Sequence, residues 1–253
     1  MIDLYGSGSP NVLKVAIMLE ELGLPYRMIY VPPHIGANYD PAFLALNPLA
    51  KVPVIVDHDG AGAEQPIYES GAILIYLAET YQSPLLPSSG PGRWEVLKWL
   101  MVQIALAGPM LGQVNHFQLM PSEQNGYGLR RFRDQAARVY RNVDDRLVSL
   151  PWLGGESYSI ADIAMYPWTG YLERHGFKTT EFPSLSTWRD LIDERPAVKR
   201  AVKMIQTTIA ADPRSQQPPT EEDTDRFFAR TQPGPAVDLP SYYALGPMVS
   251  AKA

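Results

Sequence analysis

The chain has 253 residues, of which 45% are hydrophobic, and a formal net charge of −5. This length allows one large domain or two ordinary ones, and the acidic balance argues against nucleic acid, which usually selects a basic face. The sequence contains no cysteine, which excludes disulfides and thiolate metal sites. Because the chain has no thiol, any thiol chemistry must use a sulfur atom that the protein does not supply. The sequence also contains no apolar run of about 18 residues, so we expect no membrane span.

The N-terminal segment predicts a strand, a helix and a second strand. "MIDLYG" alternates in the manner of a strand, and residues 9–23 carry helix signals. Ser9 is a suitable N-cap, Pro10 fits the first turn and Gly23 follows the last turn. Residues 26–31 are typical of a strand. Because short turns join these elements, we expect a βαβ unit with parallel strands.

The elements that follow complete a known plan. Residues 40–48 predict a short helix, and "VPVIVD" predicts the third strand. "PIYE" follows a polar, glycine-containing loop and predicts a fourth, antiparallel strand before a helix over residues 69–81. The order βαβ, α, ββα, with a proline at the start of the third strand, is the thioredoxin plan.

Pro53 stands at the start of the third strand, where its missing N–H would weaken a central sheet position. In the thioredoxin plan this proline is held cis, which occurs in only about 5–6% of X–Pro bonds. A cis bond would turn the main chain of Val52 outward, so that its N–H and C=O could pair with an extended, peptide-like ligand. The alternative is an edge-strand proline without a ligand role. "KVPVIV" alone favours that alternative, whereas the surrounding motifs favour the ligand role.

Two further segments suit a ligand that carries a carboxylate and a thiol. Glu69 and Ser70 open a predicted helix, whose N-terminal N–H groups hold carboxylates well. Ser9 and Asn11 stand at the N-terminus of the earlier helix, with Ser7 in the same turn. A hydroxyl and an amide there can stabilise a thiolate that a ligand brings in. In isolation, all five residues are equally well explained as ordinary capping or turn residues.

These motifs resemble those of cytosolic glutathione transferases, and more narrowly those of the bacterial nu class and a related fungal disulfide-reductase-like group. The resemblance covers about residues 1–210. The class usually has Thr-Pro-Asn in its first motif, and this chain keeps the hydroxyl with a serine. The stretches that carry the resemblance are Ser9-Pro10-Asn11, "NPLAKVPVIVD" at 47–57, "YESGAILIYLAE" at 68–79, "GPMLGQVNHF" at 108–117 and "PWLGGESYSIADIAMYPW" at 151–168.

The resemblance implies an α/β, thioredoxin-like N-terminal domain followed by an all-α C-terminal domain, which is the glutathione transferase fold. It implies a cytoplasmic homodimer that uses one or two glutathione molecules per subunit as cosubstrate. The start of the chain shows no secretory signal pattern, in keeping with that location. The expected limits are 1–81 for the glutathione-binding domain, 82–92 for a linker, 93–210 for the helical domain and 211–253 for an extended C-terminal tail.

The resemblance also assigns site residues by position. Ser9 and Asn11 are the expected catalytic residues. Arg131, in an arginine-rich stretch, is expected to reach glutathione across a dimer interface; interspersed acids otherwise indicate a solvated or subunit-facing helix. The four histidines have no ligand spacing, so we expect no metal site. The expected glutathione-binding residues are Asn38, Lys51, Val52, Pro53, Glu69, Ser70 and Arg131.

The rest of the chain is predicted to be mostly helical. A long helix is expected over about residues 92–120, with a kink at Gly108-Pro109. Ser159 and Asp162 have capping-box spacing, to which we assign a structural role. After about residue 210 the chain is polar and Pro-rich, which predicts a tail that is partly disordered or laid over the body.

Three functions are compatible with these residues. The first, implied by the resemblance, is a glutathione-dependent disulfide-bond oxidoreductase with glutathione transferase or peroxidase side activity. The second is a transferase that forms or cleaves thioethers of small electrophilic or aromatic compounds. It would differ in a second pocket built by residues near 105–120 and by the C-terminal tail, with Gln113, Asn115, His116 and Phe117 as candidates. The third is a non-catalytic, glutathione-binding regulatory module. None of the three involves nucleic acid or a membrane.

Overall fold

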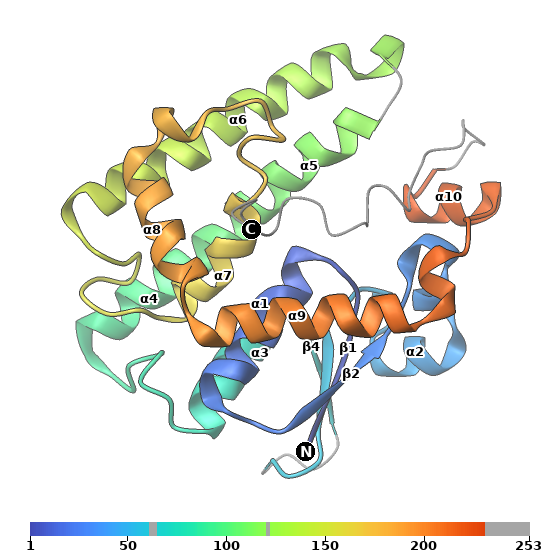
Figure 1. Ribbon diagram of the computed structural model, residues 1–253, viewed down its shortest axis with the longest axis horizontal. Coiled ribbons are helices and arrows are strands. Elements are labelled where there is room, and N and C mark those ends of the chain that lie inside the picture. Colours follow the sequence, from blue (N-terminus) through green and yellow to red (C-terminus); the bar gives the residue numbers. More distant parts are fainter. Residues whose placement is uncertain (61–64, 120–121, 231–253) are drawn as a thin grey trace. The chain divides into compact units, whose positions relative to one another are not determined.

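The computed structural model describes residues 1–60, 65–119 and 122–230, with only the backbone described at 122–125. The described chain forms two compact units (Figure 1). The first holds residues 1–80 together with 197–230, and the second holds residues 81–196. No helix of the described residues is both long enough and apolar enough to cross a membrane.

The first unit is built on a four-stranded sheet with the order β2-β1-β3-β4. β1 and β2 are parallel, whereas β3 pairs antiparallel with both β1 and β4, as the thioredoxin plan predicts. β3 is buried along its whole length, which suits the apolar residues Val54–Val56, and its last residue, Asp57, is buried as well. The strands are β1 (Ile2–Gly6), β2 (Tyr26–Tyr30), β3 (Val54–Asp57) and β4 (Pro66–Tyr68).

α1 (Pro10–Leu22) joins the two parallel strands and has the predicted ends. The Ser9 hydroxyl accepts a hydrogen bond from the Val12 N–H at 3.3 Å, and Pro10 occupies the first turn. Gly23 closes the helix with a φ of 63°, a left-handed conformation that glycine adopts without strain. The βαβ prediction is therefore confirmed down to its caps.

Three groups of short elements complete the first unit. Two 3₁₀ turns, η1 (Pro33–Ile35) and η2 (Ala37–Tyr39), lead from β2 into α2 (Pro41–Leu46). α3 (Ser70–Thr80) follows β4 and packs against α1. From the far end of the chain come α9 (Pro196–Ala211), η5 (Pro213–Gln216) and α10 (Glu221–Phe227).

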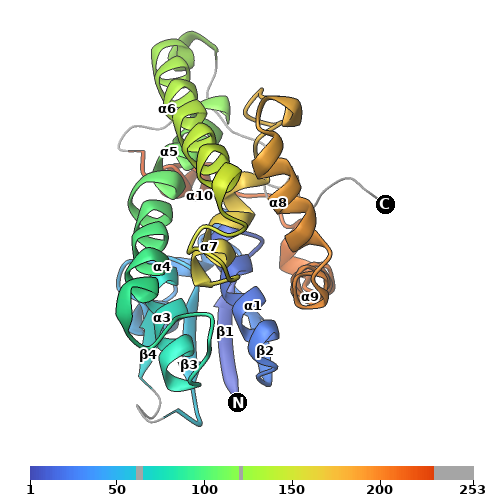
Figure 2. The same cartoon turned by 90° about the vertical axis from the view of Figure 1, so that its left-hand side faces the viewer.

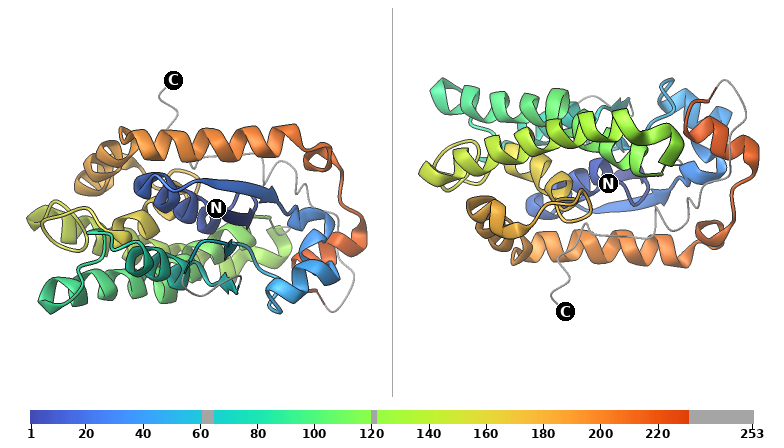
Figure 3. Two further views of the ribbon diagram at one scale, coloured as in Figure 1. Left: turned by 90° about the horizontal axis from the view of Figure 1, so that it is seen from below. Right: turned by 90° about the horizontal axis from the view of Figure 1, so that it is seen from above.

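The C-terminal elements differ from their expected arrangement. The sequence placed 197–210 in the helical domain, but the contacts of α9 group it with the first unit, where it runs alongside β2 (Figure 3). Arg200 in α9 pairs with Glu20 of α1 at 2.7 Å. The expected extended tail is also not extended between 211 and 230, because η5 and α10 form there. Residues 231–253 of that expectation lie outside the described chain.

The second unit is helical. α5 (Gly108–Leu119) and α6 (Ser122–Ser149) lie side by side (Figure 2). The predicted kink at Gly108-Pro109 takes the form of a five-residue π-helical segment, η3 (Gln103–Ala107), because Pro109 cannot donate to the preceding turn. The remaining elements are α4 (Gly90–Val102), α7 (Ile160–Thr169), η4 (Thr179–Glu181) and α8 (Pro183–Asp193).

The predicted capping box starts α7. The carboxylate of Asp162 accepts from the Ser159 N–H at 3.0 Å, and the Ser159 hydroxyl accepts from the Ala161 N–H at 3.3 Å. Asp162 also accepts from the Leu153 N–H and from the indole of Trp188, both at 2.9 Å. Burial raises the pKa of Asp162, and these hydrogen bonds oppose that shift. The structural role assigned from the sequence is confirmed.

A buried histidine joins three elements of the second unit. The Nδ1 atom of His175 lies 2.8 Å from the Tyr140 hydroxyl, and its Nε2 atom lies 3.1 Å from the Asn115 Oδ1 atom. A neutral ring satisfies both contacts, accepting from Tyr140 and donating to Asn115. Burial and the nearby charges of Arg174 and Arg133 lower the pKa of His175 to about 3.

This histidine predicts an acid-dependent loss of stability. The pKa of about 3 lies below the ordinary 6.5, so the unfolded chain binds the proton more tightly than the folded one. The free energy of unfolding should fall as pH drops through that window, by up to about 1.4 kcal/mol per pH unit from this group. Denaturant unfolding across the window should show a shallower fall for His175→Gln. Equal slopes in both proteins would contradict the assignment.

Candidate functional site

Three segments of the first unit meet at one edge of the sheet. Tyr5 pairs with Val54, and Val54 pairs with Tyr68, so the ends of β1 and β4 flank the start of β3. Neighbouring strands lie about 4.8 Å apart, so the chain that leaves β1, enters β3 and leaves β4 is brought together there. These segments are 6–11, 52–54 and 68–70, and they contain six of the nine residues expected at the site: Ser9, Asn11, Val52, Pro53, Glu69 and Ser70.

The entry to β3 has the predicted cis bond. The Val52–Pro53 peptide is cis, and β3 begins only at Val54. Pro53 therefore stands just outside the strand, where its missing N–H removes no bond from the sheet. Val52 forms no backbone–backbone hydrogen bond with another described residue. Its main chain is available to a ligand that runs past the sheet edge.

Two buried carboxamides hold the loop that precedes this bond. Asn38 donates from Nδ2 to the Ala50 carbonyl at 2.9 Å, and Asn47 donates from Nδ2 to the Lys51 carbonyl at 2.8 Å. Ala50 has a φ of 54°, an uncommon value for a residue with a Cβ, so these bonds secure a conformation that the chain does not prefer. Asn38 shapes the loop, while the side chain of Lys51 is exposed. The Asn38 Oδ1 atom is buried without a partner among the described residues.

The second strained residue is Glu69, with a φ of 69°. Its carbonyl accepts from the Ile73 N–H at 2.9 Å, so Glu69 occupies the N-cap position of α3 and Ser70 the first helical position. Ser70 is buried, whereas the Glu69 side chain is exposed. Non-glycine residues with positive φ often mark functional sites. Glu69 and Ser70 stand at the N-terminus of α3, whose free N–H groups favour the binding of a carboxylate.

The N-terminus of α1 supplies the polar groups that could meet a sulfur. Ser9 and Asn11 are half-buried there. The Ser9 hydroxyl already accepts from Val12, and it can still donate its own proton to a ligand. Ser7 is 1% exposed, and its hydroxyl has no partner among the described residues. The sequence leaves open which of the two serines would contact a ligand thiol, and both belong to the turn that precedes α1.

A buried lysine is the feature of the site region that the sequence analysis missed. Lys14 is 0% exposed, although it lies on the same helix as Asn11. Burial lowers its pKa to about 7, and the carboxylate of Glu69 acts in the opposite direction. In the sequence, Lys14 is the single charged residue within the otherwise apolar run 12–19. Because that run is apolar all round, its spacing does not show which face of the helix is exposed.

Several residues expected at the site or in its second pocket belong to the second unit. Arg131 lies on α6 and is exposed. Asn115 is bonded to His175, and Phe117 stacks on Phe132 with centroids 5.5 Å apart. Both therefore contribute to the packing of the second unit. Within the described residues, no group of three or more histidine, aspartate or glutamate side chains is placed to hold a metal ion.

Comparisons with known proteins identify the family. Residues 8–80 match the N-terminal domain of glutathione S-transferase, and residues 110–196 match its C-terminal domain. The chain is 40% identical to the disulfide-bond oxidoreductase YfcG of Escherichia coli K12 over 204 residues, which is 80% of this chain and 94% of that protein. The chain belongs to the glutathione transferase family, as its motifs indicated.

Two further similarities bear on function. A glutathione transferase family member from Pseudomonas fluorescens pf-5, solved with two glutathione molecules bound, is 38% identical, with a TM-score of 0.73. That match covers 79% of this chain and 92% of the solved one. The transcriptional regulator URE2 of Saccharomyces cerevisiae is 31% identical over 233 residues, or 77% of this chain and 65% of the regulator.

Lys14 predicts a second pH dependence. Its folded pKa of about 7 lies below the ordinary 10.5, so the destabilisation is complete below pH 7 and disappears as pH rises to 10.5. Lys14→Met should therefore raise the free energy of unfolding near pH 7, by about 1 to 4 kcal/mol. The difference should shrink as pH rises.

The control is Lys98→Met, at a lysine whose side chain is 65% exposed. It should change stability by less than about 0.5 kcal/mol at every pH. Denaturant unfolding of the three proteins makes the comparison. A Lys14→Met effect that does not vary with pH would show that the buried charge is not its cause.

Proposed function

We propose that this protein is a glutathione-dependent disulfide-bond oxidoreductase in which bound glutathione supplies the reacting thiolate. The observation that carries the proposal is the convergence of three features in a chain without cysteine: the N-terminus of α1, a main chain at Val52 that has no backbone partner among the described residues, and the N-terminus of α3 at Ser70. A thioredoxin-like site without its own thiol needs one from its ligand.

Glutathione fits this edge in one direction. Its extended main chain pairs with the N–H and C=O of Val52, as an added strand would. Its γ-glutamyl carboxylate binds at the N-terminus of α3 with the Ser70 hydroxyl, and its ammonium binds the Glu69 carboxylate. Its thiol then lies at the N-terminus of α1, near Ser9 and Asn11. Lys51 and Asn38 bind glutathione as the resemblance implies, and Asn38 also holds the loop on which the tripeptide lies.

The reaction proceeds by two thiol–disulfide exchanges. The glutathione thiolate attacks one sulfur of a disulfide, forms a mixed disulfide and releases the other sulfur as a thiolate, which takes up a proton. A second glutathione attacks the glutathione sulfur of that intermediate and releases the remaining thiol. Two glutathione molecules are oxidised to glutathione disulfide, and one substrate disulfide is reduced to two thiols. The α1 N-terminus lowers the pKa of the bound thiol, which keeps the nucleophile ionised.

The named relatives support this choice. YfcG is a disulfide-bond oxidoreductase, and the Pseudomonas fluorescens structure holds two glutathione molecules, the number that the exchange scheme uses. We extend to this chain the properties that the resemblance implied: nu-class membership, a cytoplasmic location, a homodimeric state and a glutathione contact from Arg131. Peroxidase or transferase side activity follows from the same thiolate.

Two alternatives share the same glutathione site. A conjugating or thioether-cleaving transferase would direct the thiolate at carbon, and would differ only in the pocket for the second substrate. A regulatory module would bind glutathione without turnover, and the 31% identity to the regulator URE2 favours it specifically. The intact set Ser9, Asn11, Pro53, Glu69 and Ser70 argues against a lost ligand site, whereas a retained site does not by itself prove turnover.

One pair of assays separates the three functions. The protein is given a small disulfide with glutathione, and separately an aromatic halide electrophile with glutathione. Rapid disulfide reduction with slow conjugation is expected. Rapid conjugation with slow reduction would assign the protein to the transferases. Glutathione binding with neither turnover would identify a regulatory module.

Asn11 provides the residue test. Asn11→Ala should lower kcat for disulfide reduction by about one to two orders of magnitude, because it removes the amide proposed to stabilise the bound thiolate. Calorimetry should show the Kd of glutathione changed by less than about threefold, since the tripeptide is held mainly elsewhere. Glu21→Ala, at the other end of α1, is the matched control and should leave both values unchanged. Undiminished turnover in Asn11→Ala would remove this residue from the mechanism.

A further inference from the structure

The segment after α9 packs on the two 3₁₀ turns that follow β2. We call residues 212–230, which include η5 and α10, the C-terminal clamp, and residues 33–39 the η1–η2 loop. The clamp lies outside both matched family regions, 8–80 and 110–196. All of its contacts described below lie within the first unit.

The first contact is made by Arg214. Its Nη2 atom donates to the Tyr30 carbonyl at 3.1 Å, at the point where β2 passes into the η1–η2 loop. Asp212 holds the guanidinium in place, with Nη2 and Oδ2 2.7 Å apart. Val31 in turn donates its N–H to the Gly6 carbonyl at 2.8 Å, so Arg214 acts on a chain already joined to the sheet edge of the site.

The second contact is His34, which the clamp buries. The side chain is only 1% exposed, although it belongs to a short surface turn. Burial lowers the pKa of His34, while the backbones of Arg214 and Gln217 and the charge of Asp223 act in the opposite direction. A histidine enclosed in this way fixes the η1–η2 loop against both η5 and α10.

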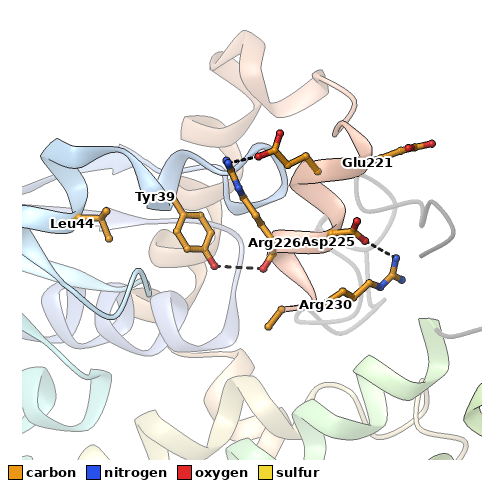
Figure 4. Close-up of a pocket in the computed structure, with 8 residues that line it drawn as sticks. Tyr39, Leu44, Glu221, Asp225, Arg226 and Arg230 are labelled. Carbon is orange, nitrogen blue, oxygen red and sulfur yellow. Dashed lines mark hydrogen bonds and ion pairs between the residues drawn. The ribbon is translucent and has the colours of Figure 1, made fainter. Parts of the chain in front are cut away.

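The third contact is with α10. The Tyr39 hydroxyl donates to the Arg226 carbonyl at 3.4 Å, and Figure 4 shows the tyrosine ring pointing at the helix. Gly36 has a φ of 71°, and a Cβ there would lie 3.2 Å from the Asp223 Oδ1 atom. Only glycine allows the helix to approach so closely without strain. A capping box between Thr220 and Asp223 keeps α10 helical.

A cavity of about 860 Å³ opens between α10 and the side chains of Tyr39 and Leu44 (Figure 4). Two ion pairs line it, Arg226 with Glu222 and Arg230 with Asp225. Glu221 also lines the cavity, and its carboxylate belongs to neither of these two ion pairs. The contacts of the clamp with the loop are the more informative feature of this region.

Between its contacts with the clamp, the η1–η2 loop carries Asn38. The Nδ2 atom of that side chain donates to the Ala50 carbonyl. Ala50 lies two residues before Val52 and has a left-handed backbone conformation. We propose that the C-terminal clamp is a positioning element for glutathione binding, which fixes Asn38 through the η1–η2 loop and so pre-organises the main chain of Val52. This inference rests on the proposed function. It adds a determinant of affinity that the two family domains do not contain.

The test uses two matched arginine variants in the full chain. Arg214→Gln removes an ion pair and a bond to a backbone carbonyl, both next to the η1–η2 loop. Arg200→Gln removes an ion pair with Glu20 at 2.7 Å and a bond to the Glu20 carbonyl at 3.3 Å, at the end of α1 and away from the loop. The two side chains are similarly exposed, at 47% and 56%.

We expect Arg214→Gln to raise the Kd of glutathione by about three- to tenfold in calorimetry, with kcat at saturating glutathione unchanged. Hydrogen exchange should quicken in peptides covering 33–39 and 47–52. Arg200→Gln should lower the melting temperature to a similar extent but leave the Kd and this exchange unchanged. Equal Kd values for Arg214→Gln and wild type would overturn the inference alone. Absence of glutathione binding by the wild-type protein would remove the proposed function and the inference together.

Discussion

The structure of the site depends on how one loop is held at the entry to β3. Asn38 and Asn47 donate to the carbonyls of Ala50 and Lys51 at 2.9 and 2.8 Å, in surroundings where an unmet carbonyl would be costly. These bonds keep Ala50 at a φ of 54° and direct the chain into the cis bond before β3. The main chain of Val52 is thereby left open to a ligand. Every role proposed for glutathione begins from that exposed backbone.

The chemistry follows from what surrounds the open backbone. Two helix N-termini, of α1 and α3, converge on it because Val54 pairs with both Tyr5 and Tyr68. Each favours negative charge, so the site suits a ligand with a carboxylate at one end and an ionised thiol at the other. The protein contributes position and electrostatics, while the nucleophile comes from the ligand. Under the proposed function, this division of roles lets a chain without cysteine take part in disulfide exchange.

Local rules predicted much of this from the sequence. The caps of α1 and the Ser159–Asp162 capping box depend on residues close together in the chain, and each was found where expected. The pairing of β3 with β1 and β4 followed from the thioredoxin plan. Side-chain contacts between distant segments were not predicted. Arg214 bonds to Tyr30 across 184 residues, and no periodic pattern marks either partner. Lys14 was missed for a similar reason, since its burial depends on packing that spacing along α1 does not reveal.

The proposed function depends on a thiolate that belongs to bound glutathione and that the protein stabilises. The most direct measurement is the pKa of the bound glutathione thiol. Carbon-13 NMR of glutathione labelled at the β carbon of its cysteinyl residue, with protein in excess, would monitor the titration as pH is varied. The account predicts a value clearly below the ordinary thiol pKa of about 8.5. A thiol that titrates at the same pH when bound as when free would contradict it.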